Sequence, residues 1–132
     1  MKAPLLAGAL MLACISATAH DYYSGFFSGG APGVGRWCCS GNLEGTMGDC
    51  SPALEWRDNP DGSMFVKPVQ YPDVWILVPA HRILPVGPPD PEAKKYPVHW
   101  CGKPRPTTLL PDKDDPDPAF VTICASRFPG GS

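Results

Sequence analysis

Prolines recur so often along this chain that a long α-helix has almost nowhere to form. The sequence contains 18 prolines and 14 glycines among 132 residues, and a proline inside a helix removes a backbone hydrogen bond and clashes with the preceding turn. No window shows a sustained helical hydrophobic period either. The aromatic residues argue against disorder, because disordered segments are normally poor in them. The composition therefore predicts an ordered, loop-rich domain that is mostly β.

Several short segments carry the patterns of β-strands. Asn59-Pro60-Asp61-Gly62 has the residues of a tight turn with a positive-φ glycine between two apolar flanks, which predicts a β-hairpin. The apolar run 74–78 lies between prolines and predicts a strand buried on both faces. Further extended segments are expected at 81–86, 96–100 and 120–124. Together they predict a small antiparallel sheet or partly open barrel of about five short strands.

The N-terminus has the features of a secretory signal peptide. Lys2 is followed by an apolar run, and Ala17 and Ala19 form the small-residue pattern at which signal peptidase cleaves. The run is too short for a membrane-spanning helix, and no later stretch is long enough for one. We therefore expect residues 1–19 to be removed and the protein to be periplasmic or secreted.

The leader also allows a second kind of processing. Leu12-Ala13-Cys14 loosely resembles a lipoprotein box, in which cleavage precedes the cysteine. Met11 stands where such boxes usually have leucine, and this cleavage would shorten the apolar run, so we favour removal of residues 1–19.

The exported chain is expected to contain one domain. Residues 20–36 join an aromatic cluster to a glycine-rich run, whose composition favours a flexible connector. Residues 37–132 hold all the expected strands and form a single small disulfide-rich β domain. The acidic stretch 112–117 lacks the glycine and glutamate of a calcium-binding loop, which predicts a solvated loop. The formal net charge is −2, and losing Lys2 makes it more negative, which argues against a nucleic-acid surface.

Five cysteines remain after the expected cleavage, and an odd number requires one without an intrachain partner. Adjacent cysteines rarely bond to each other, because the small ring strains the geometry, so Cys38 and Cys39 should reach separate partners. Two disulfides allow about fifteen arrangements, which spacing alone does not rank. One plausible arrangement joins the region of Cys38 and Cys39 to Cys101 and Cys124 and leaves Cys50 over.

The cysteine motifs together resemble a known group of proteins. The motifs are Ala19-His20-Asp21-Tyr22-Tyr23, Cys38-Cys39-Ser40-Gly41, Asp49-Cys50, Tyr96-Pro97-Val98-His99-Trp100-Cys101, and Cys124 close to Phe128-Pro129-Gly130-Gly131. They are similar to those of small secreted cysteine-rich proteins of alphaproteobacteria, an uncharacterised group with a mature N-terminal histidine and CC, DC and HxC signatures. The resemblance implies export and a compact five-cysteine domain, and it implies no activity. The glycine-rich insertion and the proline-rich loops depart from the group's pattern.

A mature N-terminal histidine makes copper binding a hypothesis. The α-amino nitrogen and imidazole of His20 would form a chelating pair, and imidazole nitrogen suits copper, which tops the affinity order of the divalent metals. One further histidine would complete a three-nitrogen site. His99 is a candidate because it shares a strand face with Cys101, and His81 is another because it lies on a neighbouring expected strand. If Cys101 is in a disulfide, it cannot act as a thiolate ligand.

The sequence carries none of the common catalytic motifs. It has no G-x-S-x-G, H-E-x-x-H or Cys-x-x-Cys, and His99 with Cys101 is the only local pair from which a base and a nucleophile could be built. Four tryptophans are expected to fill the core or supply a contact surface: Trp37, Trp56, Trp75 and Trp100. We therefore expect a non-catalytic binding or structural module of the cell envelope with a protein partner, and copper binding through His20 as the alternative.

Overall fold

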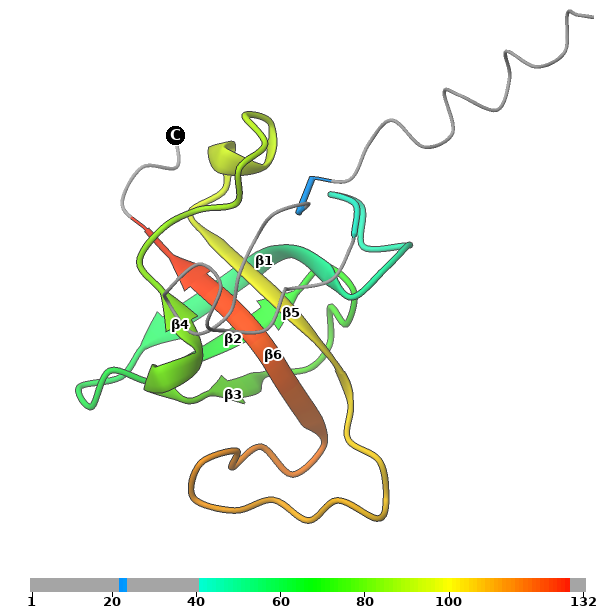
Figure 1. Cartoon of the computed structure of the whole chain (residues 1–132), viewed down its shortest axis with the longest axis vertical. Helices are drawn as coiled ribbons and strands as arrows, with labels where there is room; N and C mark the ends of the chain where they lie inside the picture. The colour runs from blue at the N-terminus through cyan, green and yellow to red at the C-terminus, as the bar shows by residue number, and fades with distance from the viewer. Residues whose placement is uncertain (1–21, 24–40, 129–132) are drawn as a thin grey trace, which may run out of the picture.

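The computed structural model describes residues 22–23 and 41–128 of the chain. Within these residues, six strands form one mixed sheet in the order β3-β2-β1-β5-β6-β4, which curls into a nearly closed barrel (Figure 1). The strands are β1 (Cys50–Asp58), β2 (Met64–Pro68), β3 (Ile76–Val78), β4 (Ile83–Leu84), β5 (Val98–Pro104) and β6 (Phe120–Arg127). All paired neighbours are antiparallel except β4 and β6, which run parallel. The prediction of a mostly β, partly open barrel is confirmed.

The hairpin of β1 and β2 forms where the turn residues predict it. The amide of Asn59 donates to the Ser63 carbonyl at 2.9 Å, and the amide of Gly62 donates to the Asn59 carbonyl at 3.1 Å. Gly62 has a φ of 92°, a left-handed conformation that glycine adopts without a Cβ clash. The turn therefore has the geometry that its sequence predicts.

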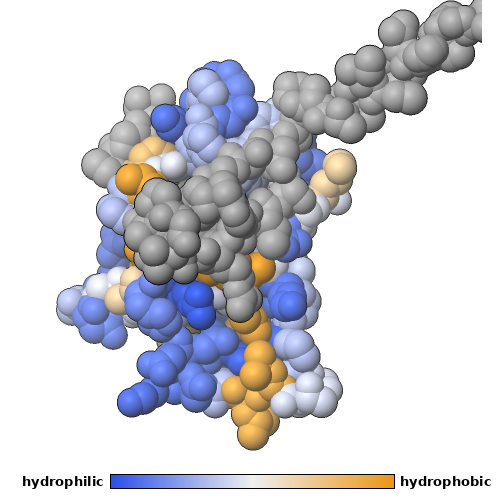
Figure 2. All heavy atoms as spheres, viewed as in Figure 1, coloured by the Kyte–Doolittle hydropathy of each residue, from blue (hydrophilic) through white to orange (hydrophobic). Residues whose placement is uncertain are grey.

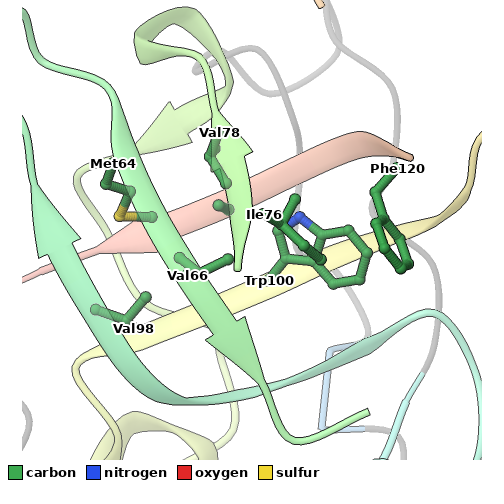
Figure 3. Close-up of a cluster of buried hydrophobic side chains, with 8 residues drawn as sticks. Met64, Val66, Ile76, Val78, Val98, Trp100 and Phe120 are labelled. Atoms are coloured by element: carbon green, nitrogen blue, oxygen red, sulfur yellow. The ribbon is translucent and has the colours of Figure 1, made fainter. Parts of the chain in front are cut away.

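The barrel interior is filled by side chains that alternate along the strands. In β2, Met64 and Val66 point inward and are fully buried, whereas Phe65 between them is exposed. The Trp100 indole lies edge-on to Phe120, with ring centroids 5.9 Å apart, and its N–H donates to the Thr122 hydroxyl at 2.8 Å. Figure 3 shows this cluster, whose buried members are Met64, Val66, Ile76, Val78, Val98, Trp100, Phe120 and Ala125.

A β-bulge in β6 decides which of its residues face outward. Cys101 pairs with Cys124, but the next residue of β5, Gly102, pairs with Thr122, so Ile123 is an extra residue. Ile123 and Cys124 consequently both face the outside of the barrel, while Thr122 bonds to the inward-facing Trp100. Without the bulge, strict alternation would turn Cys124 toward the interior.

Two of the expected strands differ in the structure. β3 has only three residues and lies at the end of the strand order, so its middle residue Leu77 is half-buried and the expectation of burial on both faces is wrong. The segment predicted at 81–86 begins as a 3-10 turn, η2 (Ala80–Arg82), and only Ile83–Leu84 pairs as a strand. A second 3-10 turn, η3 (Ala93–Lys95), precedes β5.

The acidic stretch is part of the barrel's closure and not simply a solvated loop. Asp117 is only 6% exposed, and its carboxylate accepts hydrogen bonds from three backbone amides. The Leu77 amide donates at 2.8 Å, and those of Ala119 and Phe120 donate at 2.9 Å. Because Leu77 lies in β3 and Phe120 begins β6, this one carboxylate links the two strands across the gap in the barrel.

Arg105 holds the base of the long β5–β6 loop. Its guanidinium donates to the carbonyls of Asp117 at 2.9 Å, Asp115 at 2.8 Å and Phe120 at 3.3 Å. It also forms an ion pair with the Asp115 carboxylate at 3.1 Å, and the arginine side chain is only 4% exposed. A buried, multiply bonded arginine fixes the two ends of the loop relative to each other.

Candidate functional site

Three cysteines lie side by side on the outer face of the barrel. Cys50, Cys101 and Cys124 occupy paired positions on the neighbouring strands β1, β5 and β6, and all three are fully buried. Cys50 and Cys101 form a disulfide, with their Cα atoms 4.0 Å apart. The arrangement that leaves Cys50 unpaired is therefore wrong, because the strand register places it directly against Cys101.

Cys124 is also disulfide-bonded. Its partner lies outside the described residues, since Cys50 and Cys101 bond to each other. Cys38 and Cys39, the other two cysteines expected to remain after removal of residues 1–19, also lie outside the described residues. The three described cysteines therefore serve as structural bonds of the outer face.

His99 lies beside this row of cysteines, at the centre of a buried hydrogen-bond network. Its Nε2 lies 2.8 Å from the Ala93 carbonyl oxygen and 3.1 Å from that of Tyr96. Because carbonyl oxygens only accept hydrogen bonds, Nε2 carries the proton, and Nδ1 accepts one from the Tyr23 hydroxyl at 2.7 Å. The imidazole also stacks on Phe128, with the ring planes 7° apart. One neutral histidine thus joins the N-terminal Tyr23, η3 and the end of the described chain.

Burial keeps both members of the tyrosine–histidine pair uncharged. Desolvation lowers the pKa of His99 to about 4, although its hydrogen bonds to the two carbonyls oppose that change. Desolvation and the nearby Tyr96 raise the pKa of the Tyr23 phenol. At neutral pH the network therefore consists of neutral hydrogen-bonding groups and joins parts of the fold.

The candidate metal ligands do not meet in the described part of the chain. Both ring nitrogens of His99 are engaged, and Cys101 is in a disulfide. His81 is exposed on η2, and His20 lies outside the described residues. Among residues 22–23 and 41–128, no three His, Cys, Asp or Glu side chains are placed to hold a metal ion.

The tryptophans divide between core and surface. Trp100 is fully buried, and Trp56 is half-buried beneath the guanidinium of Arg127, 5.5 Å from the ring centroid. Trp75, expected in the core, is instead half-buried on the outside, with Arg57 at 4.6 Å and Lys67 at 4.9 Å from its ring centroid. Trp37 lies outside the described residues. Trp75 is thus shielded by cations and does not form an open aromatic surface.

The β5–β6 loop carries the most exposed of the large apolar side chains that the structure describes. Leu109 is 47% exposed and Leu110 is 78% exposed. Figure 2 shows an apolar patch at the end of the molecule where Figure 1 shows this loop. Pro106 and Pro111 flank the tip, and the Leu109 amide donates to the Pro106 carbonyl at 3.0 Å. The loop is therefore an ordered projection with an apolar tip.

A groove of about 210 Å³ lies between this loop and η2. We call it the loop groove; it is lined by Arg82, Lys103, Pro106, Leu109, Val121, Thr122 and Ile123. The two charged residues are both cationic, and neither forms an ion pair with a described carboxylate. The ion pairs of the described residues involve other basic side chains: Lys67, Lys95, Arg105 and Arg127. The loop groove thus combines apolar walls with two unpaired positive charges.

A second cavity, of about 330 Å³, lies between the β1–β2 turn, η2 and the acidic stretch. Its charged or titratable lining groups are Asp61, His81 and Lys113. The Asp61 carboxylate already accepts hydrogen bonds from the Ser63 amide at 3.0 Å and hydroxyl at 2.6 Å, which lower its pKa. This cavity is lined by both a carboxylate and a lysine, and the Asp61 carboxylate is already used to stabilise the β1–β2 turn. The charge of a ligand is therefore less well defined here than in the loop groove.

No family model matches the chain, and neither a curated protein nor a solved structure matches it. The resemblance to secreted alphaproteobacterial proteins therefore stays a prediction. Within residues 22–23 and 41–128, none of the helical segments has the length and apolar character needed to cross a membrane.

The sequence prediction missed the residues that define the exposed surface. Leu109 and Leu110 stand between two prolines in an otherwise polar connection, and this pattern could have indicated an exposed apolar tip. Arg82 and Lys103 carry no comparable signal, because they are 21 positions apart and meet only through the fold. Arg105 resembles any loop arginine in sequence, and its role depends on carbonyls of the returning chain.

Proposed function

We propose that this protein is an exported, disulfide-stabilised binding module of the bacterial cell envelope, which uses the β5–β6 loop and the loop groove to contact a protein partner. One observation carries the proposal. His99 and the described cysteines, from which the sequence could build a base and a nucleophile, are buried and engaged, whereas the ordered loop exposes Leu110. Exposed apolar side chains gathered on one projection are typical of an interaction site.

The rigidity of the loop supports a role in binding. A loop that is ordered before binding loses less conformational entropy on association, so more of its contact energy is available as affinity. Here Arg105 bonds to three carbonyls at the loop base, and Asp112 accepts hydrogen bonds from the amides of Asp114 and Asp115. These bonds fix the projection without contributing a reactive group.

Export is supported by the cysteine bonds and by the leader. Disulfides persist in the periplasm and outside the cell and are rare in reducing compartments. Cys50–Cys101 and the bond of Cys124 thus suit an exported protein. The A-x-A pattern at Ala17 and Ala19 points the same way.

Site-specific photo-cross-linking tests this function. The full chain is exported from its native host with a photoreactive amino acid at Leu110, at Leu54 or at Lys94, all exposed positions. We expect one dominant protein adduct from position 110 and little from the other two. Adducts from another position alone would place the binding surface elsewhere, and a mature chain without adducts from any position would contradict the binding function.

Copper binding through His20 stays a separate prediction. His20 lies outside the described residues, and no described residue strengthens this alternative. Its test requires the native N-terminus, because only cleavage before His20 creates the chelating amine.

A further inference from the structure

We propose that the loop groove binds an extended segment of a partner protein that carries both apolar side chains and carboxylates. This inference rests on the proposed binding function, and it names the chemistry of the partner. The groove side chains that the proposal uses are Arg82, Lys103, Leu109, Val121 and Ile123.

The size of the groove favours part of a polymer over a free small molecule. Small-molecule sites usually occupy about 300–1,000 Å³. The loop groove offers about 210 Å³, which suits one or two side chains of a longer ligand. Leu110, 78% exposed at the loop tip next to Leu109, extends the apolar surface beyond the groove. An extended peptide that places one side chain in the groove can therefore contact the tip with the side chain two positions along.

The charge of the groove selects an acidic peptide. Arg82 comes from η2 and Lys103 from β5, so the fold brings two cations to one groove, and no acidic residue of the described part of the chain lines it. The whole chain has a net charge of −2, which makes this positive site a local feature. Complementary charge increases the association rate and disfavours partners of the wrong sign. Carboxylates of the partner would pair with Arg82 and Lys103.

The groove's walls supply the apolar half of the recognition. Lys103 and Val121 are paired across β5 and β6, and alternation along β6 places Ile123 on the same outer face as Val121. Leu109 covers the end of the groove from the ordered loop. Because the walls come from two strands and a braced loop, the site exists before a partner arrives.

An anionic membrane fits this surface less well than a peptide does. Asp112 and Asp114 are exposed in the same loop as Leu110, and carboxylates near the surface are repelled by anionic headgroups. A bilayer surface also leaves a concave groove unfilled. The observations therefore favour a peptide segment as the occupant.

Selection from a displayed library of random peptides tests the proposal. The mature chain is the target, and the R82E/K103E double variant is the counter-target. We expect the enriched peptides to combine Asp or Glu with Leu, Ile, Val or Phe. We also expect them to bind the double variant at least about tenfold more weakly, which corresponds to roughly 1.4 kcal/mol.

A matched variant and a second probe complete the test. K94E makes the same charge reversal at an exposed lysine on η3 and should leave peptide affinity unchanged. Equal unfolding midpoints of the variants show that the fold is retained. The proposal is overturned if the enriched peptides lack acidic residues, if they bind wild type and double variant alike, or if none is enriched. It is also overturned if only phosphatidylglycerol vesicles bind through these residues.

Failure of this proposal is distinguishable from failure of the proposed function. If position 110 gives protein adducts but the selected peptides bind wild type and the R82E/K103E variant equally, the binding function is retained and the proposal of an acidic partner segment is rejected. Absence of adducts from every tested position would reject the binding function itself.

Discussion

Replacing Asp117 with alanine should destabilise the protein more than any other change in the acidic stretch. The substitution removes one carboxylate and leaves the amides of Leu77, Ala119 and Phe120 without their acceptor. A buried donor without a partner costs about 1–3 kcal/mol. Three such donors, partly rehydrated at the barrel gap, give an expected loss of about 3–5 kcal/mol in the free energy of unfolding.

The asparagine variant refines the prediction. Asp117→Asn keeps one acceptor oxygen, which can serve Ala119 and Phe120 together, but its NH₂ group faces the donating amide of Leu77. We expect a loss of about 1–2 kcal/mol for this variant, because only one amide loses its acceptor. The three hydrogen bonds of the Asp117 carboxylate therefore predict that D117A is the least stable form, D117N is intermediate and wild type is the most stable.

Urea unfolding of the oxidised protein, followed by tryptophan fluorescence, measures these differences. Asp114→Ala is the matched control, since it removes a carboxylate from the same loop at an exposed position. Surface changes of this kind usually stay within about 0.5 kcal/mol. A D117A variant as stable as D114A would refute the link between β3 and β6.

Three further predictions concern the outer face and the N-terminus. His99 binds its proton in the unfolded chain near pH 6.5 but only near pH 4 when folded, so stability should fall by up to roughly 3 kcal/mol as pH drops between those values. Urea unfolding across pH should show this slope in wild type and not in His99→Gln; equal slopes would contradict it. If residues 1–19 are removed as predicted, peptide mapping should find Cys50 linked to Cys101, Cys124 linked to Cys38 or Cys39, and one free thiol at the other of these two; an alkylated Cys50 would contradict this. Native intact-mass analysis should show one copper only if the chain begins at His20, and metal retained after a glycine is added before His20 would reject the chelating amine.

The local parts of the fold could be predicted because their causes are local. The β1–β2 turn depends on four consecutive residues, and its hydrogen bonds lie within them or next to them. Proline spacing excluded long helices for the same reason. The position of the apolar run 74–78 could not be predicted, because a continuous apolar run does not show whether a strand lies inside the sheet or at its edge.

The contacts that define the site join distant parts of the chain. Leu77 and Asp117 are 40 residues apart, Cys50 and Cys101 are 51 apart, and Tyr23 and His99 are 76 apart. The cysteine pairing follows from strand order and register, and the other two contacts follow from how a loop and an N-terminal residue pack on the sheet; spacing alone fixes none of these. Of the arrangements that the sequence leaves open, the one with Cys50 unpaired is wrong, because cysteine spacing does not reveal that Cys101 is its register partner on β5.

The most direct measurement of the binding role is the affinity of the cross-linked partner for three forms of the mature protein. Calorimetric titration compares wild type with Leu110→Ser and with Leu54→Ser, a matched change at an apolar side chain that is 53% exposed on β1. Burying a leucine is worth about 1.5–3 kcal/mol, so we expect Leu110→Ser to weaken binding at least about tenfold. Leu54→Ser should leave the affinity unchanged. Equal affinities for all three forms would contradict binding through the β5–β6 loop.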